Sequence, residues 1–68
     1  MDMMDFTVEE INLIAIYHVE SRRKTMYRIH DVYHLMDEDI QEIATTAVQK
    51  LGSMTDTDFE LMDFIPVE

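Results

Sequence analysis

The near absence of chain-breaking residues is the feature that most constrains this fold. The sequence of 68 residues holds one glycine, Gly52, and one proline, Pro66, so neither residue type interrupts the first 51 positions. Strands joined by tight turns need such residues at regular intervals, whereas helices with short connections do not. The sequence therefore predicts an all-α fold in which one helix follows another.

Two capping signals place the first two helices. Thr7 and Glu10 form a capping box, and the apolar pattern after it predicts a helix over about residues 8–19. Ser21 is the cap of a second apolar run, which predicts a helix over about 22–36. One long helix through both is also compatible with the pattern. We favour a break, because a long helix would leave little chain to fold back.

Two further helices are predicted in the second half. Asp37 lies at the cap position of an apolar stripe that predicts a helix over about 38–51, closed by a left-handed Gly52 just beyond its end. Thr55 caps a short fourth helix over about 56–63.

These elements predict a single domain over residues 1–68, a small three-helix bundle with a short fourth C-terminal helix and an apolar tail packed on it. Residues 1–5 precede the first cap and are expected to be disordered. The tail around Pro66 is compatible with bundle closure or with a docking peptide. We favour closure, which leaves Phe64 and Ile65 as candidate interface anchors.

Charge limits the possible partners. Fifteen acidic residues against five basic ones give a net charge of -10, which repels nucleic acid phosphates and favours basic protein surfaces. We therefore expect a protein partner and no direct nucleic acid binding. The chain has no cysteine, an acidic start and no apolar run near the ~20 residues that span a bilayer, so a cytoplasmic location without membrane contact is expected.

Catalytic and metal-binding patterns are weak. The only serines, Ser21 and Ser53, lie where caps and turns are expected, and one glycine cannot form a phosphate-cradling loop. We expect no enzymatic activity, no cofactor and no small-molecule substrate. His30 and His34 have the spacing that can begin a zinc site, but two ligands are too few. We favour two solvated histidines, or a His34 that helps line the corner between the second and third predicted helices.

Four of the five basic residues crowd the start of the second predicted helix, where positive charge opposes the helix dipole. Such a patch is a candidate anchor for phosphate or an acidic partner. We favour the alternative, internal neutralisation, because carboxylates are so abundant. The patch consists of Arg22, Arg23, Lys24 and Arg28.

Three segments carry a resemblance to a known family. They are Phe6-Thr7-Val8-Glu9-Glu10-Ile11-Asn12 with Tyr17, then Ser21-Arg22, then Met54-Thr55-Asp56 with Phe59, Leu61-Met62-Asp63 and Pro66. In this order they resemble the transposon-transfer assisting proteins, small accessory proteins of conjugative transposons in Firmicutes such as clostridia. The resemblance covers nearly the whole chain and brings with it no catalytic or cofactor residue.

The resemblance implies a non-enzymatic accessory to conjugative transposon transfer, acting through contacts with element-encoded DNA-processing or transfer proteins. Composition also permits a rival function, an acidic DNA mimic that inhibits a host nuclease or DNA-binding protein. Mimicry needs one continuous acidic face, which the basic patch interrupts. A direct DNA-binding role for the second helix ranks last, since the patch would have to overcome the net charge.

Overall fold

The computed structural model describes residues 6–62 and 64. Five helical elements follow one another along them: α1 (Val8–Tyr17), α2 (Arg22–Val32), the 3-10 helix η2 (Tyr33–Leu35), α3 (Glu38–Ser53) and α4 (Asp56–Leu61). No strand occurs in this described part of the chain. The all-α prediction is therefore confirmed. The expected disorder of residues 1–5 falls outside the described residues.

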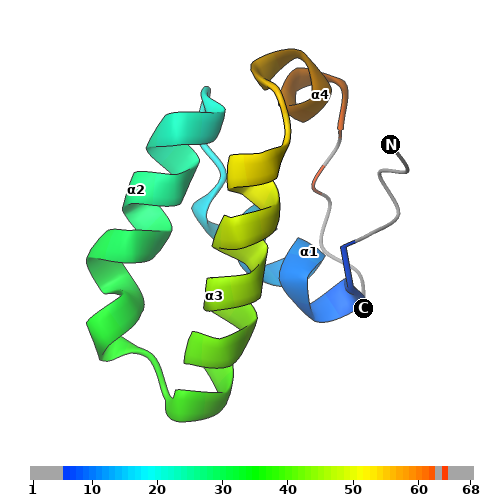
Figure 1. Ribbon diagram of the computed structural model, residues 1–68. Coiled ribbons are helices and arrows are strands. Elements are labelled where there is room, and N and C mark those ends of the chain that lie inside the picture. Colours follow the sequence, from blue (N-terminus) through cyan, green and yellow to red (C-terminus); the bar gives the residue numbers. More distant parts are fainter. Residues whose placement is uncertain (1–5, 63, 65–68) are drawn as a thin grey trace.

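The helices enclose one core. α2 and α3 lie side by side and run in opposite directions, α1 packs against both, and α4 lies near the end at which α3 finishes (Figure 1). Ala44 and Ala47 on α3 are fully buried, and their small side chains let the neighbouring helices approach closely. All four α-helices contribute to the buried cluster, which consists of Leu13, Ile14, Ile29, Ala44, Ala47, Leu51 and Phe59.

The capping box that begins α1 is present as predicted. The backbone N–H of Thr7 donates to Oε1 of Glu10 at 2.8 Å, and the N–H of Glu10 donates to Oγ1 of Thr7 at 3.1 Å. The helix ends at Tyr17, two residues earlier than predicted, because the N–H of Val19 donates instead to Oγ1 of Thr25 at 3.1 Å. The end of α1 is therefore fixed by a side chain of the next helix.

A sharp break separates α1 from α2, so the alternative of one long helix is wrong. Ser21 has an extended backbone, and its hydroxyl accepts the N–H of Lys24 at 3.1 Å. The fully buried Thr25 donates its hydroxyl to the carbonyl of Ser21 at 2.8 Å. Thr25 thus holds both sides of the turn, since the same oxygen accepts the N–H of Val19.

The predicted second helix changes character near its end. The α-helix stops at Val32, and Tyr33–Leu35 continue as a 3-10 turn instead of as α-helix to residue 36. The N–H of Met36 bonds the carbonyl of Tyr33 at 3.1 Å, and the side chain of Gln41 donates to the same carbonyl at 3.0 Å. This tighter last turn leads the chain into the corner before α3.

The predicted end of α3 is also wrong. The helix runs through Gly52 to Ser53, and no described residue has a positive φ, so Gly52 is not a left-handed cap. The carbonyl of Leu51 is satisfied by the guanidinium of Arg22, which donates to it at 2.8 Å. The side chain of Arg22, which is distant in the sequence, therefore caps this end of α3 in place of the predicted glycine. Asp37 is the N-cap residue, as predicted, although its side chain forms no capping hydrogen bond.

The short α4 begins as predicted and ends early. The hydroxyl of Thr55 accepts the N–H of Asp58 at 3.0 Å, which is the expected cap. The helix stops at Leu61, two residues before the predicted end, and the N–H of Met62 bonds the carbonyl of Phe59 at 3.2 Å. Phe64 packs against the core.

Candidate functional site

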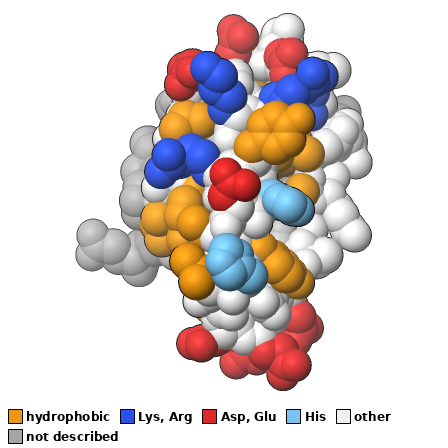
Figure 2. All heavy atoms as spheres, turned by 90° about the vertical axis from the view of Figure 1, so that its left-hand side faces the viewer, with side chains coloured by type: hydrophobic (Ala, Val, Ile, Leu, Met, Phe, Trp, Pro, Cys, Tyr) orange, Lys and Arg blue, Asp and Glu red, His pale blue; other side chains and the backbone are white. Residues whose placement is uncertain are grey.

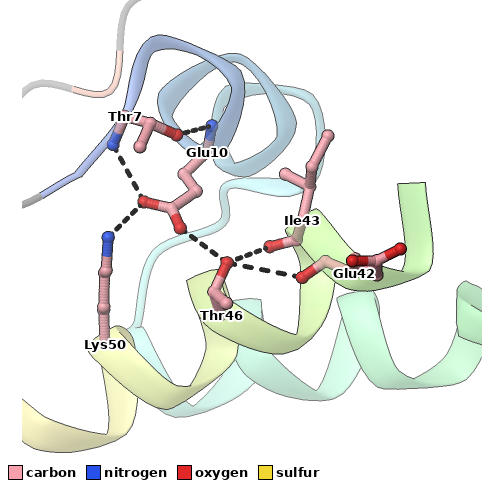
Figure 3. Close-up of polar contacts among 6 residues, drawn as sticks. All are labelled: Thr7, Glu10, Glu42, Ile43, Thr46 and Lys50. Atoms are coloured by element: carbon pink, nitrogen blue, oxygen red, sulfur yellow. Dashed lines mark hydrogen bonds and ion pairs between the residues drawn. The ribbon is translucent and has the colours of Figure 1, made fainter. Parts of the chain in front are cut away.

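A buried polar network joins α1 to α3 (Figure 3). The Glu10 side chain is only 5% exposed, and its Oε1 lies 2.7 Å from Nζ of Lys50. Its Oε2 accepts the hydroxyl of Thr46 at 2.6 Å, while Oε1 also accepts the N–H of Thr7. Both carboxylate oxygens therefore have partners within the fold, and the network acts as a structural clamp between the two helices.

Competing effects set the pKa of Glu10. Desolvation by burial raises the pKa, and the hydrogen bonds from Lys50, Thr46 and the Thr7 backbone lower it, together with the charge of Lys50. The lowering effects prevail, so the pKa lies below its ordinary value of 4.5. Glu10 is thus a carboxylate at neutral pH and stabilises the fold in that form.

Sequence reasoning missed this network. It assigned Glu10 only its local role in the capping box. The ion pair joins residues 40 positions apart, and the Thr46 hydrogen bond joins residues 36 apart. No local sequence pattern predicts a contact over such a separation. The one local indication was that Glu10, a charged residue, immediately precedes the apolar residues of α1.

The structure divides the predicted basic patch into paired and unpaired residues. The Arg22 side chain is 16% exposed, and its Nε donates to Oδ1 of Asp56 at 2.9 Å while Nη1 bonds the carbonyl of Leu51. Arg22 therefore ties the start of α2 to the end of α3 and the start of α4. These contacts explain why an arginine stands at the start of α2, where its charge opposes the helix dipole.

The other three basic residues of the patch lie on the surface of α2. Lys24 pairs with Glu20 at 2.7 Å, and this bond lowers the pKa of Glu20 and raises that of Lys24. Arg23 and Arg28 are exposed, and neither has a hydrogen bond or ion pair with any residue in the described part of the chain. Internal neutralisation thus accounts for half of the patch and leaves two arginines available to a partner.

The two histidines of the candidate metal pair are exposed. His30 lies on α2 and His34 on the 3-10 turn after it. Within residues 6–62 and 64, no group of three or more potential ligands comes together around a possible metal position. The structure thus places the pair on the surface without the third ligand that a zinc site needs.

The described part of the apolar tail packs on the bundle. The Phe64 ring is half-buried and lies edge-on to the ring of Phe6, with 5.7 Å between the centroids. It also contacts Phe59 and His18, at 5.5 and 5.8 Å, and His18 stacks on Phe59 at 5.0 Å. Phe64 therefore closes the bundle. Ile65, the other predicted anchor, lies outside the described residues.

Negative charge gathers at the turn from η2 into α3, which we call the acidic corner. Asp37, Glu38, Asp39 and Glu42 form it, and all four are exposed. Figure 2 shows Asp and Glu side chains clustered at the lower end of this face of the molecule. A shallow groove beside the corner is lined by Tyr33, Glu38, Gln41, Glu42, Thr45 and Thr46. The four carboxylates thus lie within six consecutive residues of the chain.

None of the helices in the described part combines the length and the apolar character needed to cross a membrane.

Comparison with known proteins identifies the family. Among curated proteins and among solved structures, none matches this chain. One family matches, described as "putative transposon-transfer assisting protein", and the match extends over residues 6–66. The chain belongs to this transposon-transfer assisting protein family.

Proposed function

We propose that this protein is a non-enzymatic accessory that assists transposon transfer by contacting the DNA-processing or transfer proteins of its element. The observation that carries the proposal is the family match, which spans residues 6–66 and therefore the whole described bundle. The family's description supplies the transfer-assisting role. The exposed acidic corner is the surface through which we expect the contact to form.

The acidic corner fits a basic protein partner. Proteins that handle DNA carry basic surfaces, because they neutralise phosphate charges. An accessory with a net charge of -10 is attracted to such surfaces over about a Debye length, ~8 Å at physiological salt. We infer that the acidic corner meets a basic surface beside the DNA-binding site of the partner.

The polar interior supports a binding role rather than a catalytic one. Glu10 and Thr25 are the buried polar residues of the described chain, and both have their hydrogen bonds within the fold. A reactive group in a catalytic site would instead point into a cleft where substrate can reach it. The hydrogen bonds of Glu10 and Thr25 instead hold helices and turns of the bundle together.

Affinity purification of the tagged protein from cells that carry its element tests the contact. We expect a relaxase, integrase or coupling protein to co-purify, and we expect it to remain after nuclease treatment of the lysate. The Asp39→Asn/Glu42→Gln variant removes two charges of the acidic corner, so it should recover roughly tenfold less of that partner. Mass spectrometry with labelled reference peptides measures the recovered amounts.

The matched control is the Glu9→Gln/Glu60→Gln variant. It also removes two exposed carboxylates, but from α1 and α4, and should recover the partner as the wild type does. Equal recovery by both variants would place the contact elsewhere than the acidic corner. Recovery of host nucleases or nucleoid proteins, without proteins of the element, would instead support the DNA-mimic function.

A further inference from the structure

The groove beside the acidic corner has an aromatic side and an acidic side. It has a volume of about 460 Å³ and lies between η2 and the exposed face of α3. Tyr33 lines it from η2, and Glu38 and Glu42 line it from α3. None of the described residues that line the groove is basic. The positive charge that would complement it must therefore come from a partner.

Tyr33 is held against α3 at two points. Its backbone carbonyl accepts the side-chain N–H of Gln41 at 3.0 Å, and its hydroxyl oxygen lies 3.4 Å from Oγ1 of Thr45. The Thr45 hydroxyl is itself fixed, because it donates to the carbonyl of Gln41 at 2.8 Å. Tyr33 nevertheless remains 37% exposed. A side chain that is already ordered loses little entropy when a ligand stacks on it, so the Tyr33 ring is preorganised for such a contact.

The two carboxylates of the groove lie about one helical turn apart on the same side of α3. Glutamates four positions apart face the same way, and their like charges repel each other. Glu38 and Glu42 are both exposed, and neither carboxylate has a hydrogen bond or ion pair with any residue in the described part of the chain. A cation bound beside them would relieve this repulsion.

We propose that the groove binds an arginine side chain of a protein partner. The guanidinium stacks on the ring of Tyr33 and donates hydrogen bonds to Glu38 or Glu42. An acidic surface alone attracts every cation, so the selective element is the fixed aromatic ring. Arginine fits better than lysine, because its planar guanidinium both stacks on aromatic rings and pairs with a carboxylate through two N–H groups.

This inference rests on the proposed function for the identity of the partner, and it names the side chain by which a basic DNA-processing or transfer protein is recognised. The chemistry of the groove can be tested without that partner. The probes are three short peptides, acetyl-Gly-Gly-Xaa-Gly-Gly-amide, in which Xaa is arginine, lysine or citrulline. Citrulline has nearly the shape of arginine but carries no charge.

NMR titration of the isotope-labelled full chain with these peptides measures the preference. In about 0.15 M salt, we expect the arginine peptide to shift the amide signals of Tyr33, Glu38 and Glu42 most. It should bind about threefold more tightly than the lysine peptide, and the citrulline peptide should not bind. Equal affinity for arginine and lysine, or shifts centred on other residues, would overturn the proposal.

Two substitutions of Tyr33 separate the ring from its hydroxyl group. Tyr33→Phe keeps the ring and should bind the arginine peptide within about twofold of the wild type, whereas Tyr33→Leu should bind it about threefold more weakly. The matched control is Tyr27→Leu, since Tyr27 is 63% exposed on α2 and does not line the groove. Circular dichroism checks that each variant retains its helices. An arginine preference that survives in Tyr33→Leu would contradict the role of the ring.

Affinity purification from cells that carry the element separates this inference from the proposed function. Tyr33→Leu should recover roughly threefold less of the transfer partner than the wild type or Tyr27→Leu. Equal recovery by all three would overturn arginine binding at Tyr33 and leave the assisting role standing. Absence of any transfer protein from the wild-type sample would contradict the proposed function, while the peptide titration would still decide the chemistry of the groove.

Discussion

Replacing Ile14 by alanine should destabilise the protein by about 2–5 kcal/mol, a large share of the stability of so small a domain. Ile14 is fully buried where α1 meets the other helices. Truncation removes apolar surface from the core and leaves a cavity that the surrounding helices cannot fill. Urea unfolding followed by circular dichroism measures the change in the free energy of unfolding.

The control is a second isoleucine on the same helix. Ile16 lies two residues further along α1 and is 68% exposed, so Ile16→Ala should change the free energy of unfolding by less than about 0.5 kcal/mol. Both substitutions have the same effect on helix propensity. Similar losses for Ile14→Ala and Ile16→Ala would contradict the packing of α1 described above.

Replacing Glu10 by alanine should have the second large effect, about 2–4 kcal/mol. The substitution removes the carboxylate half of the capping box and the hydrogen bonds that Lys50 and Thr46 donate to Glu10. Lys50 retains some access to water, being about one-third exposed, which moderates the cost. The adjacent Glu9 is exposed in the same helical turn, so Glu9→Ala is the matched control and should cost less than about 0.5 kcal/mol.

The same residue gives the fold a pH dependence of predictable sign. The pKa of Glu10 in the folded chain is lowered below its ordinary value of 4.5, so its contribution is complete above that pH and disappears as pH falls through the lower folded pKa. The stability difference between the wild type and Glu10→Gln should therefore be constant near neutral pH and shrink below about pH 4.5. A difference that grows on acidification would contradict the assigned network.

Local signals predicted the helices well, and long-range contacts determined where they end. The caps at Thr7, Ser21 and Thr55 are local features, because each side chain bonds a backbone N–H three residues on. The ends depend on distant residues. Thr25 from α2 takes the N–H of Val19 after α1, and the guanidinium of Arg22 takes a carbonyl near the end of α3.

The candidate interaction residues were predictable only in part. The sequence identified the basic patch as a group, but the positions of Arg22 and Arg23 in space differ completely although they are neighbours in the chain. Arg22 points into the junction of α2, α3 and α4, whereas Arg23 is exposed on the first turn of α2. Helical geometry separates adjacent side chains by about 100°. The placement of α3 and α4 therefore decides which arginine becomes structural.

Transfer frequency in mating experiments tests the central claim most directly. The comparison uses donor cells in which the gene for this protein is deleted and then restored as wild type, as Asp39→Asn/Glu42→Gln or as Glu9→Gln/Glu60→Gln. Our account predicts that deletion lowers transfer of the element by roughly tenfold or more, that the wild type and the Glu9/Glu60 variant restore it, and that the acidic-corner variant does not. Unchanged transfer from the deletion donor would contradict the assisting role, and full restoration by the acidic-corner variant would contradict the proposed contact.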